Sequence, residues 1–362
     1  MDIIAVVGAR PNFMKVAPLV PVLTRAGHRV RLAHTGQHYD DSMSNVFFRD
    51  LDIPEPDWFL GVGSGRHAVQ TGTAMMLLEE LLSAECPDAI LVIGDVNSTL
   101  AAALAAVKIH IPIIHLEAGL RSFDMTMPEE VNRLVTDQVS ALLLTPTVRA
   151  CDNLRSEGVD PERIHFVGNI MAETLLRALP ALSGKPRPIP GLEPGSYALA
   201  TIHRPENTDS SERLASIASG LGGLNMPVVV PAHPRLEPLL AQAGVTASGT
   251  VSIVEPVGYL DMLALMREAA IVITDSGGIQ EEACMLDVPC VTVRRNTERQ
   301  ETIDVGANRL CRPQCEEIID AVSEALALPK GWPKPARWDD QVSERIAVAL
   351  AGGVKPLPGT RP

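Results

Sequence analysis

The chain has 362 residues, of which 46% are hydrophobic and 21% are charged, as expected of a globular protein with about two domains. Its 31 Lys and Arg against 44 Asp and Glu give a formal net charge of −13, which argues against a nucleic-acid binder because such proteins usually carry a basic surplus. The first residues lack the basic segment of a signal peptide, and Lys108, His110 and Pro112 interrupt the apolar stretch 100–116, so we expect a cytoplasmic protein without a membrane span.

Short apolar runs rich in β-branched residues alternate with amphipathic stretches along the chain. Because these runs show no polar alternation, they predict strands that are covered on both faces. They lie at 3–7, 30–34, 89–93, 111–116, 141–144, 164–167, 197–202, 227–230, 251–254, 270–274 and 289–293. Predicted helices between them include 100–107, 131–142, 213–221 and 261–267. The alternation predicts α/β architecture with parallel sheets and right-handed crossovers.

A stretch dense in Pro and Gly at 180–195 separates two sets of these elements. Such density disfavours regular structure and is typical of a linker or surface loop. We therefore expect two Rossmann-like domains, 1–170 and 171–362, and a helix at 339–350 that could pack back on the first domain.

Polar side chains follow the predicted strands in both halves. The carboxyl ends of parallel strands face the ligand crevice of such a sheet, so two crevices facing each other would form one central cleft. The residues concerned are Arg10, Asp95 and Glu117 in the first half, and His203, Arg204, His233, Asp275, Arg294 and Arg295 in the second.

The stretch 275–282 follows a predicted strand and opens a predicted helix. Gly277 and Gly278 would let a phosphate approach the backbone amides of the helix N-terminus, and Ser276 adds a hydroxyl donor. One turn further on, Glu281 or Glu282 could accept hydrogen bonds from ribose. An ordinary turn with a helix cap would explain the same residues.

A second strand-to-helix junction places Arg10 and Lys15 near a helix start. It does not match the GxGxxG fingerprint of dinucleotide sites. Arg suits bidentate phosphate recognition, although solvated surface charge is the alternative.

Asp95, Glu117 and Glu130 could gather at the mouth of the first sheet. Crowded carboxylates raise one another's pKa, which suits proton transfer near neutral pH. Thr126 and Glu129 have the spacing of a capping box, so Glu129 has a structural explanation. We expect no metal, because no cluster shows ligand spacing, and the six cysteines are expected to be reduced thiols.

Taken together, these segments resemble the non-hydrolysing UDP-N-acetylglucosamine 2-epimerases over nearly the whole chain. The matching segments are 8–11, 35–38, 94–95, 115–121, 128–133, 203–204, 275–282 and 297–299. The chain departs from the usual family pattern at Ala9, Asn12 and Gln300, where the family often has Thr, Glu and Pro. These departures bear on sugar specificity rather than on the central residues.

The resemblance implies a GT-B-like fold and a reaction that needs neither NAD nor a metal. UDP would be eliminated from UDP-N-acetylglucosamine to leave 2-acetamidoglucal and then added back, giving UDP-N-acetylmannosamine. It further implies a homodimer with a UDP-sugar as its ligand. By motif, the catalytic group is Asp95, Glu117, Glu130 and His203, and the substrate-binding residues are Arg10, Lys15, Ser276, Gly277, Gly278 and Glu282. Gln37, His38 and His233 match part of an activator site seen in some members.

Several alternatives stay open at this point. The same chemistry on UDP-2,3-diacetamido-glucuronate would give Arg294, Arg295 and Arg299 a carboxylate to bind. A hydrolysing variant would release N-acetylmannosamine and UDP. A GT-B glycosyltransferase or a non-catalytic nucleotide-sugar binder is disfavoured by the three carboxylates.

Overall fold

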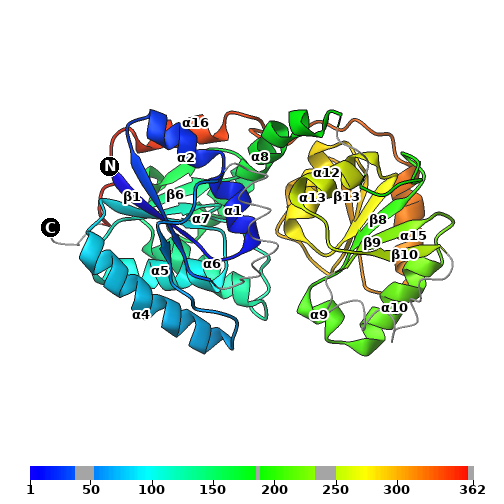
Figure 1. The fold of residues 1–362 in the computed structure, drawn as a ribbon, viewed down its shortest axis with the longest axis horizontal. Helices are drawn as coiled ribbons and strands as arrows, with labels where there is room; N and C mark the ends of the chain where they lie inside the picture. The colour runs from blue at the N-terminus through cyan, green and yellow to red at the C-terminus, as the bar shows by residue number, and fades with distance from the viewer. Residues whose placement is uncertain (37–52, 185–187, 233–249, 358–362) are drawn as a thin grey trace. The chain divides into compact units, whose positions relative to one another are not determined.

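The structure is a computed structural model that describes residues 1–36, 53–184, 188–232 and 250–357. The chain forms two compact units: Met1–Arg177 together with Ala336–Pro362, and Ala178–Pro335. It thus leaves the first unit after Arg177, a little beyond residue 170 where the sequence suggested a boundary, and returns to it at Ala336. Figure 1 shows both units.

The first unit is built on a parallel sheet in the order β3-β2-β1-β4-β5-β6-β7. Its strands are β1 (Asp2–Val7), β2 (Arg29–His34), β3 (Trp58–Phe59), β4 (Ala89–Ile93), β5 (Ile113–Leu116), β6 (Leu142–Thr145) and β7 (Ile164–Phe166). The strand order reverses between β1 and β4. In doubly wound sheets ligands bind outside the carboxyl ends of the strands at such a reversal.

Helices cover both faces of this sheet (Figure 1). They are α1 (Arg10–Val16), α2 (Leu19–Arg25), α4 (His67–Glu85), α5 (Asn97–Lys108), α6 (Pro128–Val139), α7 (Val148–Ser156), α8 (Ile170–Ala178) and α16 (Val342–Leu350), with a 3₁₀ turn at Pro161–Arg163. Along β1, Ile3 packs with α2 and α16 while Ile4 packs with α4 and α5. Since successive strand residues point to opposite faces, an uninterrupted apolar strand is what a sheet covered on both sides requires.

The second unit repeats the plan with a parallel sheet in the order β10-β9-β8-β11-β12-β13. Its strands are β8 (Ala198–Thr201), β9 (Val228–Pro231), β10 (Val251–Val254), β11 (Ile271–Thr274), β12 (Cys290–Val293) and β13 (Asn308–Cys311). Its helices are α9 (Pro205–Thr208), α10 (Ser211–Gly222), α12 (Tyr259–Glu268), α13 (Gly277–Met285), α14 (Gln300–Asp304) and α15 (Cys315–Ala327), preceded by a 3₁₀ turn at Leu179–Leu182. α10 and α15 pack on one face of the sheet, and α12 and α13 pack on the other.

The sequence located most of these strands to within two residues, but one predicted cap is wrong. α6 begins at Pro128 with Met127 as its N-cap, and no side chain caps it. Thr126 Oγ1 instead donates to Asp124 Oδ1 at 2.6 Å, so Thr126 and Glu129 form no capping box. Within the described residues, no helix is both long and apolar enough to cross a membrane.

Candidate active site

The carboxyl edge of the first sheet brings Lys15, Glu117 and the Gly94–Asp95 turn together. Lys15 Nζ forms an ion pair with Glu117 Oε2, and both side chains are almost fully buried. Gly94 has φ +65°, and a Cβ there would lie 3.2 Å from Lys15 Nζ and 3.4 Å from Glu117 Oε2. The turn before Asp95 therefore packs directly against the ion pair, at the reversal of strand order.

Asn12 fixes the loop before α1, a role that the sequence did not predict. Its Oδ1 accepts hydrogen bonds from the backbone N–H groups of Gly8 and Ala9, both at 3.0 Å. Its Nδ2 donates to the carbonyl oxygen of Ile93 at 3.0 Å, one residue before Gly94. Asn12 thus links the first loop to the Gly94–Asp95 turn. The side chain of Arg10 lies outside the described part of the structure.

Arg133 joins two of the predicted carboxylates. Its Nη1 donates to Asp95 Oδ2 at 2.5 Å, and its Nε and Nη2 donate to Glu130 Oε2 at 2.9 and 2.5 Å. Asp95 keeps 30% of its side-chain surface exposed, whereas Glu130 keeps 2%. The sequence placed Arg133 in a matching segment without a role; its spacing of three residues from Glu130 on one helix was the available signal.

Glu130 also holds the loop that precedes α6. Its two oxygens accept from the backbone N–H groups of Ser122 and Phe123 and from the Ser122 hydroxyl, at 2.9 to 3.0 Å. Burial alone would raise the pKa of Glu130, but the Ser122 N–H and the Arg133 guanidinium hold it below its ordinary value. Glu130 is therefore an ionised anchor for this loop.

In the second unit, Asp275 orients His203. The buried carboxylate lies 2.9 Å from His203 Nδ1 and accepts hydrogen bonds from the backbone N–H groups of His203 and Arg204 and from Asn207 Nδ2. Burial opposes its ionisation, yet the His203 hydrogen bond and charge keep the pKa of Asp275 below its ordinary value. With Nδ1 turned to Asp275, the outward nitrogen of His203 is Nε2.

The predicted phosphate loop opens α13. Ser276 is the N-cap residue of the helix, and Gly277 and Gly278 form its first turn. A Cβ at Gly277 would lie 2.9 Å from Glu298 Oε1, so a larger residue here would force the Glu298 side chain to move. Glu298 contacts Arg294 at 3.0 Å and Arg204 at 3.7 Å. The loop thus combines free helix amides with basic groups.

Glu281 and Glu282, the two candidates for ribose, have different surroundings. Glu281 Oε1 lies 2.7 Å from Arg299 Nε, with which it forms an ion pair. Glu282 packs against the Tyr259 hydroxyl, and burial raises the pKa of Glu282 to about 7. Burial, reinforced by Glu282, raises the pKa of Tyr259 well above its ordinary value. Glu282 is thus the carboxyl group that can hold or release a proton near neutral pH.

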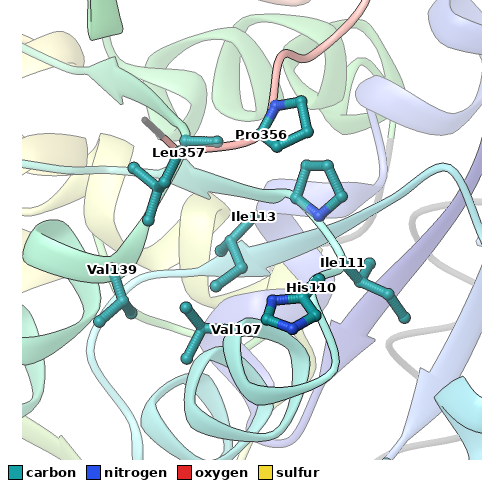
Figure 2. Close-up of a pocket in the computed structure, with 9 residues that line it drawn as sticks. Val107, His110, Ile111, Ile113, Val139, Pro356 and Leu357 are labelled. Atoms are coloured by element: carbon teal, nitrogen blue, oxygen red, sulfur yellow. The ribbon is translucent and has the colours of Figure 1, made fainter. Parts of the chain in front are cut away.

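Other predicted features lie elsewhere. Gln37, His38 and His233 fall outside the described residues. Among the residues that the structure does describe, no group of three or more His, Cys, Asp or Glu is placed to hold a metal ion. Figure 2 shows a small hollow at the opposite edge of the first sheet, lined mostly by apolar side chains, among them Ile113 at the start of β5 and Leu357 of the C-terminal segment. It contains none of the predicted site residues.

Comparison with known proteins decides the family. Residues 22–351 match the family described as UDP-N-acetylglucosamine 2-epimerase. The chain belongs to the UDP-N-acetylglucosamine 2-epimerase family. The UDP-N-acetylglucosamine 2-epimerase of Methanococcus maripaludis is 40% identical to it over 97% of this chain and 98% of the relative. The UDP-2,3-diacetamido-2,3-dideoxy-D-glucuronate 2-epimerase of Pseudomonas aeruginosa is 41% identical over 97% of this chain and 99% of the relative.

A solved structure of the family supports the fold as well. The Methanocaldococcus jannaschii UDP-GlcNAc 2-epimerase, crystallised with UDP-GlcNAc and UDP, matches with a TM-score of 0.92 and 38% identity over 98% of this chain and 100% of that one. The expected α/β class, two Rossmann-like parallel sheets of the GT-B-like type, is confirmed.

Proposed function

We propose that this protein interconverts UDP-N-acetylglucosamine and UDP-N-acetylmannosamine by inverting C2. The observation that carries the proposal is the packing of Lys15, Glu117 and the Gly94–Asp95 turn into one cluster at the switch point of the first sheet. Family membership supplies the reaction class, because the relatives include several named for epimerisation at this position.

The chemistry begins at the bond between C1 and the diphosphate. The proton on C2, the carbon that carries the acetamido group, is only weakly acidic, so C1–O cleavage leads and the C2 proton passes to a carboxylate. The products are UDP and 2-acetamidoglucal, with a C1–C2 double bond. In the return step C2 takes a proton on the opposite face, and the diphosphate oxygen re-forms the bond to C1. No electron is gained or lost overall.

Asp95 and Glu117 are the proposed proton carriers of this cycle. Asp95 is partly exposed, and Glu117 forms a buried ion pair with Lys15 beside it. Glu130 was expected to share this work. Its hydrogen bonds from Ser122, Phe123 and Arg133 favour a positioning part instead, because each proton it took up would break one of them.

The departing diphosphate is stabilised by the second unit. Ser276, Gly277 and Gly278 offer the amides of the α13 N-terminus, and Arg10 adds charge from the first unit. His203, held by Asp275, donates from Nε2 to the leaving oxygen. Glu282 binds the ribose. We propose that the enzyme is cytoplasmic and homodimeric.

A diacetamido-glucuronate substrate is the second candidate, favoured by the Pseudomonas aeruginosa relative. Such a sugar brings an extra carboxylate, which needs a cation. Arg294 is already paired with Glu298, and Arg299 is paired with Glu281; all four residues are buried. The neutralisation of these two cations favours the uncharged sugar of UDP-N-acetylglucosamine, whereas Arg295, the third candidate, is exposed.

The test is incubation of the protein with UDP-N-acetylglucosamine in D₂O, followed by proton NMR. UDP-N-acetylmannosamine with deuterium at C2 is the expected product. Free N-acetylmannosamine would indicate hydrolysis, and turnover of the diacetamido-glucuronate alone would reassign the substrate. Glu117→Gln is expected to abolish the exchange, and exchange at the wild-type rate would remove Glu117 from the mechanism.

A further inference from the structure

A chain of buried charged side chains lies behind the carboxylates of the first unit. His115 on β5 and Asp137 on α6 have no exposed side-chain surface, and Arg121 has 1%. Asp137 lies 2.7 Å from both His115 Nδ1 and Arg121 Nη1. Arg121 in turn donates two hydrogen bonds to Glu157, at 2.6 and 2.7 Å. The mechanism above uses none of these four side chains.

Each ring nitrogen of His115 faces an oxygen atom. Its Nε2 lies 2.8 Å from the carbonyl oxygen of Gly94, which can only accept a hydrogen bond. Its Nδ1 faces Asp137. Burial opposes ionisation there, but the charges and hydrogen bonds of His115 and Arg121 hold the pKa of Asp137 below its ordinary value, so this carboxylate is also an acceptor. Both ring nitrogens therefore face acceptors, an arrangement that a doubly protonated ring satisfies.

His115 and Asp137 contact the backbone next to each of the two proposed proton carriers, Asp95 and Glu117. The oxygen that accepts from His115 belongs to Gly94, the residue before Asp95. The other oxygen of Asp137 accepts from the N–H of Gly119, two residues after Glu117, at 3.1 Å. Gly119 has no room for another residue, because a Cβ would lie 2.4 Å from the carbonyl oxygen of Ala150.

The backbone at Glu117 needs hydrogen bonds that hold its conformation. Glu117 has φ +69°, a left-handed conformation that costs a non-glycine residue about 1–3 kcal/mol and persists only where the surroundings enforce it. The bonds to Gly119 from Asp137 and from Asn153, whose Nδ2 donates to the Gly119 carbonyl at 2.9 Å, enforce it from the C-terminal side. His115 lies on β5, two residues before Glu117, and ties this segment to the Gly94 turn.

We propose that His115, a doubly protonated ring paired with Asp137, is a positioning residue that holds the Asp95 and Glu117 carboxylates in register with each other. It touches no substrate and acts through the backbone of Gly94 and Gly119. The proposal rests on the proposed function, because it takes Asp95 and Glu117 to be the groups that move the C2 proton.

The first test is ¹⁵N NMR of the wild-type chain with labelled histidine at pH 7. The ring of His115, assigned through bonds from its backbone, is expected to show two protonated nitrogens. One unprotonated ring nitrogen would overturn the proposal. This readout does not depend on any activity of the protein.

The second test compares His115→Gln with Glu157→Gln in the D₂O assay. Glutamine keeps one donor but no charge and cannot bridge Gly94 to Asp137. We expect kcat to fall at least about tenfold while KM stays within about twofold, since misplacement of a reacting group affects the chemical step. Glu157→Gln perturbs the same buried chain at its outer end, away from Gly94 and Gly119, and is expected to lower Tm but leave kcat within about twofold.

The outcomes separate the two proposals. Equal kcat losses in both variants, or an unchanged kcat in a folded His115→Gln chain, would overturn the positioning role. If the wild-type chain turned over neither UDP-sugar, the proposed function would fail, whereas the ring spectrum would still decide the protonation of His115. The spectrum also keeps the proposal testable if His115→Gln does not fold.

Discussion

His203 is the most exposed of the predicted catalytic residues, with 62% of its side chain accessible. An exposed imidazole would rotate freely. The contact between Nδ1 and the buried Asp275 carboxylate holds the His203 ring in one orientation. The arrangement follows the logic of an Asp–His pair, in which the carboxylate selects the tautomer and the ring orientation. The Asp275 carboxylate matters as an acceptor of several donors rather than as a proton carrier.

Asp275→Asn is expected to lower kcat by about a hundredfold, the lower end of the range found for lost acid–base groups, with a smaller change in KM. The amide presents a donor where Asp275 now accepts four hydrogen bonds, so the ring loses its orientation. Steady-state kinetics would show the change. His203→Asn in the same chain should add little further loss, and additive losses would contradict the pairing.

Gly277→Ala is expected to weaken UDP binding by about tenfold. The new methyl group would lie 2.9 Å from Glu298 Oε1, so Glu298 would move and disturb Arg294 and Arg204 beside the loop. Isothermal titration with UDP measures the effect. Gly222→Ala is the matched control, because a Cβ there meets nothing within 4 Å. Equal affinity in both variants would show that the loop does not bind the diphosphate.

At the scale of elements, the apolar runs located nearly every strand because both sheets are covered on both faces. The sequence missed two strands, the two-residue β3 and β13, whose Asn308 and Arg309 break the apolar run. It also missed α4, where apolar residues spread around the whole helix and form no single stripe. It also could not find Asn12, Asp275 or Asp137 as anchors, because each bonds to residues far away in the sequence that become neighbours only in the folded chain.

The buried carboxylate of Glu173 on α8 forms hydrogen bonds with the first turn of α16. Glu173, with a fully buried side chain, accepts the backbone N–H of Ser343 at 2.6 Å and bonds the Ser343 hydroxyl and Arg177. Glu173→Ala is expected to cost about 1–3 kcal/mol of unfolding free energy, because the Ser343 N–H loses its acceptor in a buried place.

Urea denaturation would measure this cost. Glu344→Ala on the same helix is the control, since the Arg25–Glu344 pair is more than half exposed and such pairs contribute at most about 1 kcal/mol. Equal losses in the two variants would contradict the anchoring role of Glu173.

For the whole molecule, buried carboxyls give the unfolding free energy a two-sided dependence on pH. The pKa values of Glu130, Asp137 and Asp275 are lowered in the folded state. Their stabilisation is therefore present above the unfolded values and is lost as the pH falls through the folded ones. Glu282 has the opposite sign: its pKa rises from 4.5 to about 7, so its contribution falls as the pH rises between these values.

Glu282→Gln is accordingly expected to flatten the decline in stability between about pH 4.5 and 7 while leaving the acid limb in place. Urea midpoints measured at half-unit pH intervals would show it. An unchanged slope would mean that Glu282 is not the buried acid responsible. The acid limb serves as the internal control, because Glu130, Asp137 and Asp275 remain.

The return of the chain to the first unit at Ala336 has a consequence for synthesis on the ribosome. Val342, Ile346 and Leu350 of α16 complete the core that β1 and α2 begin. β1 and α2 therefore keep apolar surface uncovered until the second unit and then α16 have been made. These two elements are translated long before their core is complete, and a chaperone has its longest opportunity in that interval.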